Sequence, residues 1–186
     1  MQHAPTMPKE PPLGEEGGIF AGFVPLFELG RGSYGAVYLL QNSEGLKAVD
    51  KRVKLDNLTE KEKKCAIQEM ELLRQLEHPH ITRYRHSFHS FPCVVGPGLW
   101  SGRHHELLHL IMDYCDGGTV EDAIRDLRQE GRSRAEPDTV RRWMCQCTCA
   151  LAYLHGQKIL HRDIKPANIM LVEVEMPAGA AGAAGD

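Results

Sequence analysis

The hydrophobic pattern of the chain changes part-way along, and the change predicts two regions of different structure. Residues 23–41 place apolar positions on both sides of a glycine cluster, which is typical of two strands joined by a turn. Further strands are predicted at residues 45–55, around residues 82–88 and at residues 106–114. The first region is therefore predicted to form a small sheet.

One helix is predicted within this sheet region, at residues 59–77. Thr59 can cap the first turn, and Glu62, three residues further on, fits a capping box. His78-Pro79 ends the helix, because the residue before a proline avoids the helical conformation. The apolar residues that share one face of the helix are Ile67, Met70, Leu73 and Leu76.

The second region, which follows Gly117-Gly118, is predicted to be mainly helical. A helix opens at Thr119 and extends to residue 128, and a longer helix covers residues 137–155. The apolar stripe of the longer helix contains Val140, Trp143, Met144, Cys147, Leu151 and Leu154. Strands with one helix, followed by helices alone, predict an α+β fold in which a small sheet-based lobe joins a mainly helical lobe.

Three segments lack such patterns. Residues 1–18 are rich in proline, glycine and glutamate, and we expect a disordered tail there. Residues 173–186 end in an alanine- and glycine-rich run and are expected to be flexible. Residues 92–105 form a long connection containing glycine and proline, which we interpret as an exposed insertion.

Composition narrows the function classes. The net charge of −3 gives no reason to expect nucleic acid or an anionic membrane as the main partner. No apolar run approaches the roughly 20 residues of a membrane span, and the first residues do not follow the layout of a secretory signal. The six cysteines are therefore expected to be reduced. We expect an intracellular, cytoplasmic protein, with nuclear or cytoskeletal association left open.

A glycine-rich loop predicts phosphate binding. Gly30, Gly32, Gly35 and Val37 form the pattern G-x-G-x-x-G-x-V. Glycine lets the backbone approach phosphates closely, and the turn is expected to need unusual dihedral angles. Dinucleotide-binding folds use the same spacing but continue into a helix, whereas residues 36–40 form a strand pattern. A glycine-rich hairpin without a ligand remains the alternative for the loop taken alone.

Residues 161–168 read His-Arg-Asp-Ile-Lys-Pro-Ala-Asn and match the pattern H-R-D-x-x-x-x-N. Together with the glycine loop, Ala48-Val49-Asp50-Lys51 and the run from Met112 to Gly118, they make the chain resemble a eukaryotic-type serine/threonine protein kinase. The amino-acid sequences of these motifs are most similar to those of the NIMA-related branch of this kinase family. The resemblance implies a partial kinase domain at residues 19–172, with an N-lobe (19–112), a hinge (113–118) and only the start of the helical C-lobe (119–172).

The resemblance also implies roles for individual residues in transferring the γ-phosphoryl group of ATP, with Mg²⁺, to protein Ser/Thr hydroxyls. Asp163 would orient the substrate hydroxyl, Lys165 would neutralise the transferring phosphate, and Asn168 would ligate magnesium. Lys51 would hold the α- and β-phosphates and pair with Glu69. The nucleotide would further contact Leu29, Gly30, Arg31, Gly32, Ser33, Tyr34, Gly35, Val37, Val49, Met112 and the backbone of Asp113 and Cys115.

Two details of the lysine strand differ from a simple match. The family favours an apolar residue where this chain has Asp50, so the strand is expected to be weaker or partly solvated there. Lys47 and Lys54 remain rivals of Lys51, although Lys54 falls on the opposite face by strand alternation. Most helical glutamates are solvated, so the choice of Glu69 depends on the resemblance.

No Asp-Phe-Gly and no Ala-Pro-Glu follows Asn168 in the sequence. We therefore expect a fragment or truncated form of a kinase, with no meaningful transfer activity by these residues alone. Asp186 could be the aspartate of the missing motif, severed from its Phe-Gly. The alternative is a non-catalytic, kinase-derived module that binds ATP or partners without turnover. The apolar face of the longer helix would then be covered by a protein partner.

Cysteine and histidine residues outside these motifs are not expected to hold metal. Cys145, Cys147 and Cys149 cannot converge on one ion, because helical positions two apart point about 200° from each other. Cys147 lies in the apolar stripe and is expected to pack in the core. The histidines lack paired ligand spacing, so surface or loop positions are expected for them.

Overall fold

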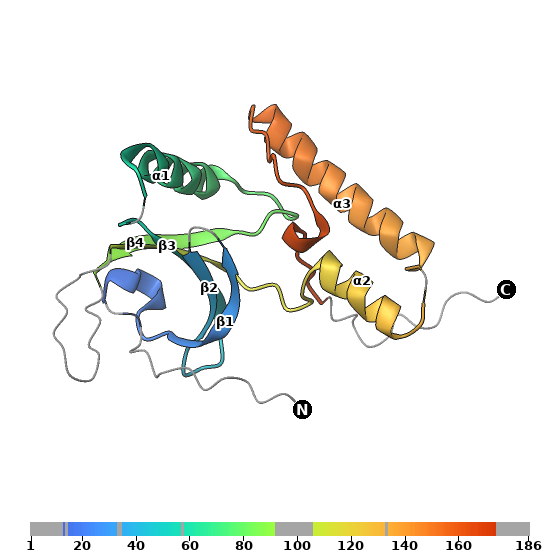
Figure 1. Ribbon diagram of the computed structural model, residues 1–186, viewed down its shortest axis with the longest axis horizontal. Helices are drawn as coiled ribbons and strands as arrows, with labels where there is room; N and C mark the ends of the chain where they lie inside the picture. Colours follow the sequence, from blue (N-terminus) through green and yellow to red (C-terminus); the bar gives the residue numbers. More distant parts are fainter. Residues whose placement is uncertain are drawn as a thin grey trace. The chain divides into compact units, whose positions relative to one another are not determined.

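The sheet contains five strands in the order β1-β2-β3-β5-β4, and each neighbouring pair is antiparallel (Figure 1). The computed structural model describes residue 13 and residues 15–32, 35–56, 58–91, 106–132 and 134–173. The strands are β1 (Val24–Gly32), β2 (Gly35–Gln41), β3 (Lys47–Lys54), β4 (Tyr84–Ser90) and β5 (Leu107–Asp113). All five lie where the alternating patterns predict them.

The helices also follow the sequence pattern. They are α1 (Glu60–Gln75), α2 (Val120–Gln129) and α3 (Pro137–Gly156), with short 3-10 helices η1 (Glu15–Phe20) and η2 (Pro166–Asn168). The predicted α+β class with only the start of a helical lobe is confirmed. None of the helices in the described ranges is long and apolar enough to cross a membrane.

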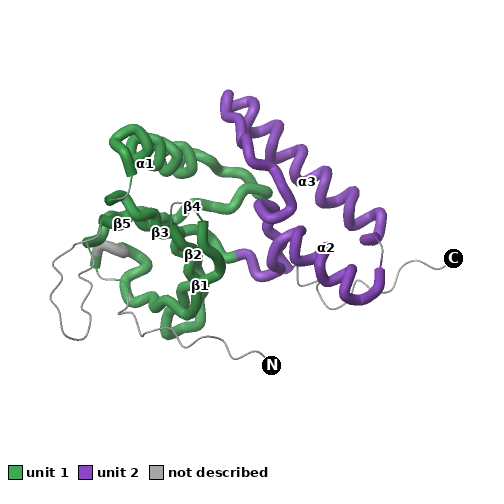
Figure 2. Tube along the Cα trace, viewed as in Figure 1, with its two compact units in different colours: residues 1–114 green, residues 115–186 purple. Residues whose placement is uncertain are grey.

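The chain divides into two compact units, residues 1–114 and residues 115–186 (Figure 2). The first unit contains the sheet, η1 and α1, and the second contains α2, α3 and η2. The division falls between Tyr114 and Cys115, inside the segment predicted as a hinge. The residues of each unit therefore pack mainly against other residues of the same unit.

The sheet of the first unit has one apolar cluster on each face. On one face, Met70 and Leu73 of α1 pack against buried strand residues (Val53, Leu55, Leu108 and Leu110). On the other face, the buried residues are Phe20, Phe23, Leu40, Ala48 and Ile111. Successive residues of β3 alternate between these faces, so Val53 belongs to the α1 cluster and Ala48 to the opposite one. Figure 1 shows α1 and the 3-10 helix η1 on opposite sides of the sheet.

The segment before β1 is more ordered than its composition predicts. Residues 15–18, assigned above to a disordered tail, form the first part of η1. Leu13 packs against the apolar cluster, and its N–H donates to the carbonyl of Phe23 at 2.9 Å. Phe20 and Phe23 meet edge to face, with ring centroids 5.1 Å apart. Aromatic burial therefore orders a segment that lacks helix-forming composition. The predictions for residues 1–12, 92–105 and 174–186 fall outside the described residues.

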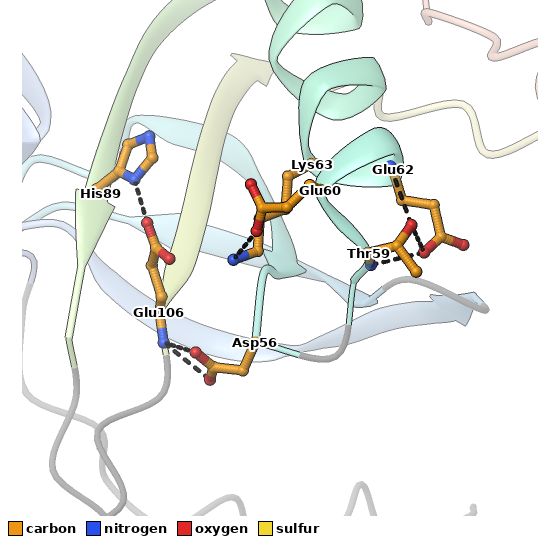
Figure 3. A network of polar contacts seen from close by, with 7 residues as sticks. All are labelled: Asp56, Thr59, Glu60, Glu62, Lys63, His89 and Glu106. Carbon is orange, nitrogen blue, oxygen red and sulfur yellow. Dashed lines mark hydrogen bonds and ion pairs between the residues drawn. The ribbon is translucent and has the colours of Figure 1, made fainter.

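The capping box predicted for α1 is present. The Thr59 hydroxyl accepts from the N–H of Glu62, and the Glu62 carboxylate accepts from the N–H of Thr59 at 2.8 Å (Figure 3). Hydrogen bonds from the Thr59 backbone and then from its hydroxyl lower the pKa of Glu62 below its ordinary value. These reciprocal bonds satisfy donors that every helix start leaves open.

A second polar cluster joins the ends of β3, β4 and β5. The backbone N–H of Glu106 donates to both carboxylate oxygens of Asp56, at 2.9 and 3.1 Å (Figure 3). The Glu106 side chain contacts His89 at 3.2 Å, and the Glu106 carbonyl accepts a hydrogen bond from the N–H of Leu55 at 2.9 Å. Glu106 therefore connects three strands just before β5 begins.

Asp50 differs most from what the sequence predicts. The sequence favours a weakened or partly solvated strand at this position, but Asp50 is completely buried, at 0% exposure. Its carboxylate accepts from Arg52 Nε at 2.7 Å and contacts His109 Nδ1 at 3.0 Å. The opposite ring nitrogen of His109 lies 2.7 Å from the Ser90 hydroxyl, and Phe88 stacks on the His109 ring at 4.4 Å. Asp50 therefore links β3 to β5 through His109, and His109 links β5 to β4 through Ser90 and Phe88.

The contacts run from Ser90 to His109 and from His109 to Asp50, which is the serine–histidine–aspartate arrangement of a serine-hydrolase triad. Such a triad needs a carboxylate that stabilises a protonated imidazole. Here Arg52 already balances the charge of Asp50, and its guanidinium lies 4.2 Å from the Tyr38 ring centre. The Asp50 carboxylate is thus shared between Arg52 and His109, which favours a structural network over a catalytic triad.

Replacing Asp50 by alanine tests this network. The substitution leaves Arg52 and His109 buried without their carboxylate, so we expect the free energy of unfolding to fall by roughly 3–5 kcal/mol. Denaturant unfolding followed by circular dichroism measures the change. Glu71→Ala, at an exposed position of α1, should change it by less than about 0.5 kcal/mol. Equal midpoints for the two variants would show that the network contributes little.

Candidate functional site

The predicted site residues are distributed over both units. Those of the glycine loop, the lysine strand and α1 belong to the first unit, and Cys115 and residues 161–168 belong to the second. Ser33 and Tyr34, at the tip of the glycine loop, lie outside the described residues. The geometry within each unit nevertheless tests several of the predicted contacts.

The three glycines of the loop serve different purposes. A Cβ on Gly35 would lie 1.7 Å from the Arg52 carbonyl oxygen, so β2 can approach β3 only with glycine at this position. A Cβ on Gly30 or Gly32 would meet nothing within 4 Å. None of the three adopts a left-handed φ, so the expectation of unusual dihedral angles is wrong for them. Gly30 and Gly32 instead leave an open backbone surface, which suits a close approach of phosphate.

The side chains around the loop are placed by the register of β1, β2 and β3. Val37 of β2 stands opposite Lys51 of β3, and both are on the face that carries α1. Arg31 pairs with Glu28 at 2.5 Å, and this contact raises the pKa of Arg31. Leu29 is 41% exposed, as expected for a residue that could cover a ligand.

Lys51 meets Glu69 as the resemblance implies. Lys51 Nζ lies 3.0 Å from Glu69 Oε1, which joins β3 to α1 across 18 residues of sequence. The side chains are 38% and 59% exposed, so the pair contributes at most about 1 kcal/mol to stability. Of the rivals, Lys47 lies over the Tyr114 ring at 5.5 Å and Lys54 is exposed. Lys51 is therefore the lysine of β3 that contacts Glu69.

The end of β5 is fixed from β4. Met112 stands opposite both Val49 and Tyr84 in the sheet. The backbone N–H of Asp113 donates to the Arg83 carbonyl at 3.0 Å, so this N–H is already used within the sheet. The Asp113 carboxylate accepts from Arg85 Nη2 at 3.0 Å, and this contact raises the pKa of Arg85. A nucleotide contact from the Asp113 backbone would therefore have to use another group than its N–H.

In the second unit, Asp163, Lys165 and Asn168 lie together. Lys165 Nζ is 3.0 Å from Asp163 Oδ2, and Asn168 Nδ2 donates to the same oxygen at 2.8 Å and to the Asp163 carbonyl at 2.9 Å. The contact with Lys165, followed by that with Asn168, lowers the pKa of Asp163 below its ordinary value. The carboxylate is therefore ionised at neutral pH and is held to accept a further hydrogen bond.

The segment that follows residues 161–168 is bound to the start of α2. Met170 bridges to Thr119, the N–H of Val120 donates to the Ile169 carbonyl at 2.9 Å, and the N–H of Leu171 donates to Gly118 at 2.8 Å. A Cβ on Gly117 would lie 3.0 Å from Leu171, which explains glycine there. The Thr119 capping box starts α2 at the same point and lowers the pKa of Asp122. The sequence pattern predicted these glycines as a break between the two regions and as the end of a hinge.

Asn168 is suited to a hard cation. Its amide nitrogen donates to Asp163, which leaves the amide oxygen to act as a ligand. Mg²⁺ prefers oxygen ligands and is usually held by one or two protein groups together with phosphate oxygens. Within the described ranges no group of three or more His, Cys, Asp or Glu side chains could hold a metal ion. The Asn168 amide oxygen is therefore one protein group to which a divalent cation can bind.

The family described as the protein kinase domain matches residues 23–177, which is most of the chain. This chain belongs to the protein kinase family. Membership implies ATP and a divalent metal ion as the ligands of the domain.

Individual relatives agree with the resemblance to the NIMA-related branch. The chain is 36% identical over 149 residues to mouse serine/threonine-protein kinase Nek4, a match that covers 80% of this chain and 17% of Nek4. It is 34% identical to human Nek2, covering 78% of this chain and 31% of that protein. A probable serine/threonine-protein kinase nek2 of Dictyostelium discoideum is 35% identical, at 78% and 32% coverage. The kinase family and its NIMA-related character are thus confirmed, and the chain spans a third or less of these relatives.

The pKa of Asp163 provides a test of this geometry. The pKa of Asp163 is lower in the folded protein than in an unfolded chain. The contacts of Asp163 therefore stabilise the fold at pH values above the ordinary aspartate pKa, and this stabilisation is lost as the pH falls through the lowered pKa. Replacing Lys165 by methionine should move this pKa upward, and NMR titration of the carboxyl carbon measures it. Lys158→Met, on the exposed turn after α3, should leave it in place. A pKa that stays low in Lys165→Met would assign the shift to Asn168 instead.

Proposed function

We propose that this chain binds ATP and provides the nucleotide-holding and hydroxyl-orienting residues of a protein kinase that phosphorylates serine and threonine. The ion pair between Lys51 and Glu69 carries the proposal, because it fixes a lysine on β3, two strands from the open backbone of Gly30 and Gly32 on β1. An exposed pair of this kind does little for stability. Its position is better explained by a polyanionic ligand.

The residues would divide the reaction as follows. Lys51 neutralises the α- and β-phosphates, and Glu69 holds the lysine in place. Asp163 accepts a hydrogen bond from the substrate hydroxyl and thereby orients it. Its lowered pKa makes the carboxylate a weak base, so it does not remove the hydroxyl proton before transfer begins. Lys165 would balance charge on the moving phosphoryl group, and Asn168 would contribute one oxygen to a magnesium ion, which would supply positive charge to neutralise the phosphates.

A second candidate is nucleotide binding without turnover by these 186 residues alone. The sequence contains no Asp-Phe-Gly, the motif whose aspartate ligates magnesium in kinases. Without that ligand the charge developing on the phosphoryl group is poorly balanced. We therefore propose that transfer requires a further segment carrying a carboxylate ligand, and that the present residues act as a binding module in its absence.

The substrate and cellular setting are extensions of this proposal. The substrate would be a protein with a serine or threonine hydroxyl, and the setting would be intracellular, where ATP is abundant.

The second unit also has an apolar groove of about 380 Å³ that a protein partner would cover. Apolar residues that line it are Val120, Ile124, Leu127, Val140, Trp143, Met144 and Ile169.

ATP binding can be measured with a fluorescent ATP analogue on the purified chain. Lys51→Met removes a charged contact with the phosphates, which corresponds to about 1.5–3 kcal/mol and hence to a loss of affinity of about 10- to 100-fold. The control is Lys54→Met, at an exposed position of the same strand but on the opposite face. Equal affinities for both variants and the unchanged chain would contradict the assignment of Lys51.

Phosphoryl transfer should be assayed in this chain extended by a kinase segment that carries Asp-Phe-Gly, with radiolabelled ATP and a generic serine/threonine substrate. Asp163→Asn removes the carboxylate that orients the hydroxyl, so kcat should fall by about 10²- to 10⁴-fold while the KM for ATP stays within a few-fold. Retained kcat in Asp163→Asn would remove Asp163 from the reaction. Robust transfer by the 186 residues alone would overturn the need for a further ligand.

A further inference from the structure

Strand β1 contains a bulge beside the glycine loop. Its pairing with β2 shifts by one residue between Glu28 and Gly30, so Leu29 is an extra residue on β1. In an undisturbed strand, two residues that are three apart face opposite sides of the sheet. A bulge between them changes the direction of the side chains that follow it. The bulge therefore places Glu28 and Arg31 on the same face.

The pairing of the strands identifies this face. Arg31 lies opposite Ala36, and Ala36 lies opposite Arg52 on β3. Residues directly opposite each other on neighbouring strands share a face of the sheet. Arg31 is therefore on the face that carries Asp50 and Arg52, whereas Lys51 is on the other face. This placement separates the Arg31 side chain from the lysine assigned to the phosphates.

The two glycines beside Arg31 belong to the opposite face. Gly30 lies opposite Val37, which pairs with Lys51, and Gly32 lies opposite Gly35. A Cβ on Gly30 or Gly32 would meet nothing within 4 Å. The loop therefore leaves open space on the face of Lys51 and has its charged side chain on the other.

Glu28 holds Arg31 on its face of the sheet. Arg31 Nε donates to one carboxylate oxygen of Glu28 at 2.9 Å, and Arg31 Nη2 donates to the other at 2.5 Å. Two parallel bonds of this kind fix the orientation of a guanidinium as well as its position. Glu28, and after it Tyr38, raise the pKa of Arg31 above its ordinary value, so Tyr38 also interacts with the guanidinium.

Tyr38 connects this pair to the buried network of β3. The Arg52 guanidinium lies 4.2 Å from the centre of the Tyr38 ring, and Arg52 Nε lies 2.7 Å from the Asp50 carboxylate. Asp50 is completely buried, whereas the side chain of Arg31 is 59% exposed. The contacts therefore run from a carboxylate inside the sheet to a residue at its edge, within the glycine loop.

We propose that Glu28 is a positioning residue for phosphate binding, and that it holds the Arg31 side chain as an anchor of the glycine loop on the face away from the phosphates. A side chain fixed on one face restricts the backbone to which it is attached. The anchor thereby reduces the conformational freedom that Gly30 and Gly32 would otherwise lose when a ligand binds. The inference rests on the proposed binding of ATP. It assigns Arg31 a role through its backbone rather than through its charge.

Three variants separate an anchor from a phosphate ligand: Glu28→Gln, Arg31→Met and the two combined. An exposed ion pair changes an equilibrium constant by at most about 5-fold. We therefore expect each single variant to bind the fluorescent ATP analogue about 3- to 5-fold more weakly, and the double variant no more weakly than either. The affinity for adenosine, measured by displacement of the analogue, should not change, because adenosine has no phosphate.

The opposite results would overturn the proposal. If Arg31 contacted phosphate, Glu28→Gln would release the guanidinium and leave ATP affinity equal or higher, while Arg31→Met would still weaken it. Additive losses in the double variant would also contradict an anchor. An equal loss of adenosine affinity would show that Glu28 only supports the fold. The matched control is Glu44→Gln, the same charge change in the exposed turn between β2 and β3, which should alter neither affinity.

Amide hydrogen exchange gives a measurement without nucleotide. The amides of Gly30 and Gly32, followed by NMR, should exchange about 3- to 5-fold faster in Glu28→Gln than in the unchanged chain. Unchanged exchange would overturn the anchor. Failure of the unchanged chain to bind the ATP analogue would overturn the proposed function and the role in phosphate binding with it. Equal ATP affinities in a binding chain and its variants would overturn only the present inference.

Discussion

The alternation of side chains along β3 is the constraint on which the rest of the first unit depends. Asp50 and Arg52 point to one face of the sheet and Lys51 to the other, because successive strand residues face opposite sides. A shift of one residue in register would exchange these faces and bury the lysine. The contact of Asp50 with His109 on β5 disfavours such a shift, since it exists in one register only. Lys51 is thus placed by a network on the other side of its own strand.

The backbone imposes a second constraint at the same place. Gly35 lies against the Arg52 carbonyl so closely that any side chain would force β2 away from β3. The glycine pattern, interpreted from sequence as a phosphate loop, therefore also reflects strand packing. Gly30 and Gly32 have no such neighbour, so the packing of the sheet does not require their small size. One motif combines a structural glycine with two that leave space.

Local patterns predicted the strands, the helices and the caps, because periodicity and turn chemistry are properties of neighbouring residues. Contacts between distant residues were not predictable in this way. The buried partner of Asp50 is His109, 59 residues further along the chain, and no local pattern connects them. The order of residues 15–18 likewise depends on Leu13 and Phe20 packing on the sheet, against the preference of their own composition. The Asp163 cluster was found because its residues are five or fewer apart.

The two ion pairs on β3 differ in burial and therefore in their contribution to stability. Asp50 and Arg52 are almost fully buried, so loss of one partner leaves an unbalanced charge that costs several kcal/mol. Lys51 and Glu69 are largely exposed, and water replaces either partner at little cost. A pair that can open cheaply can also exchange its partner for a phosphate, which a buried pair cannot do. The same strand therefore holds its shape through one pair and leaves the other available to a ligand.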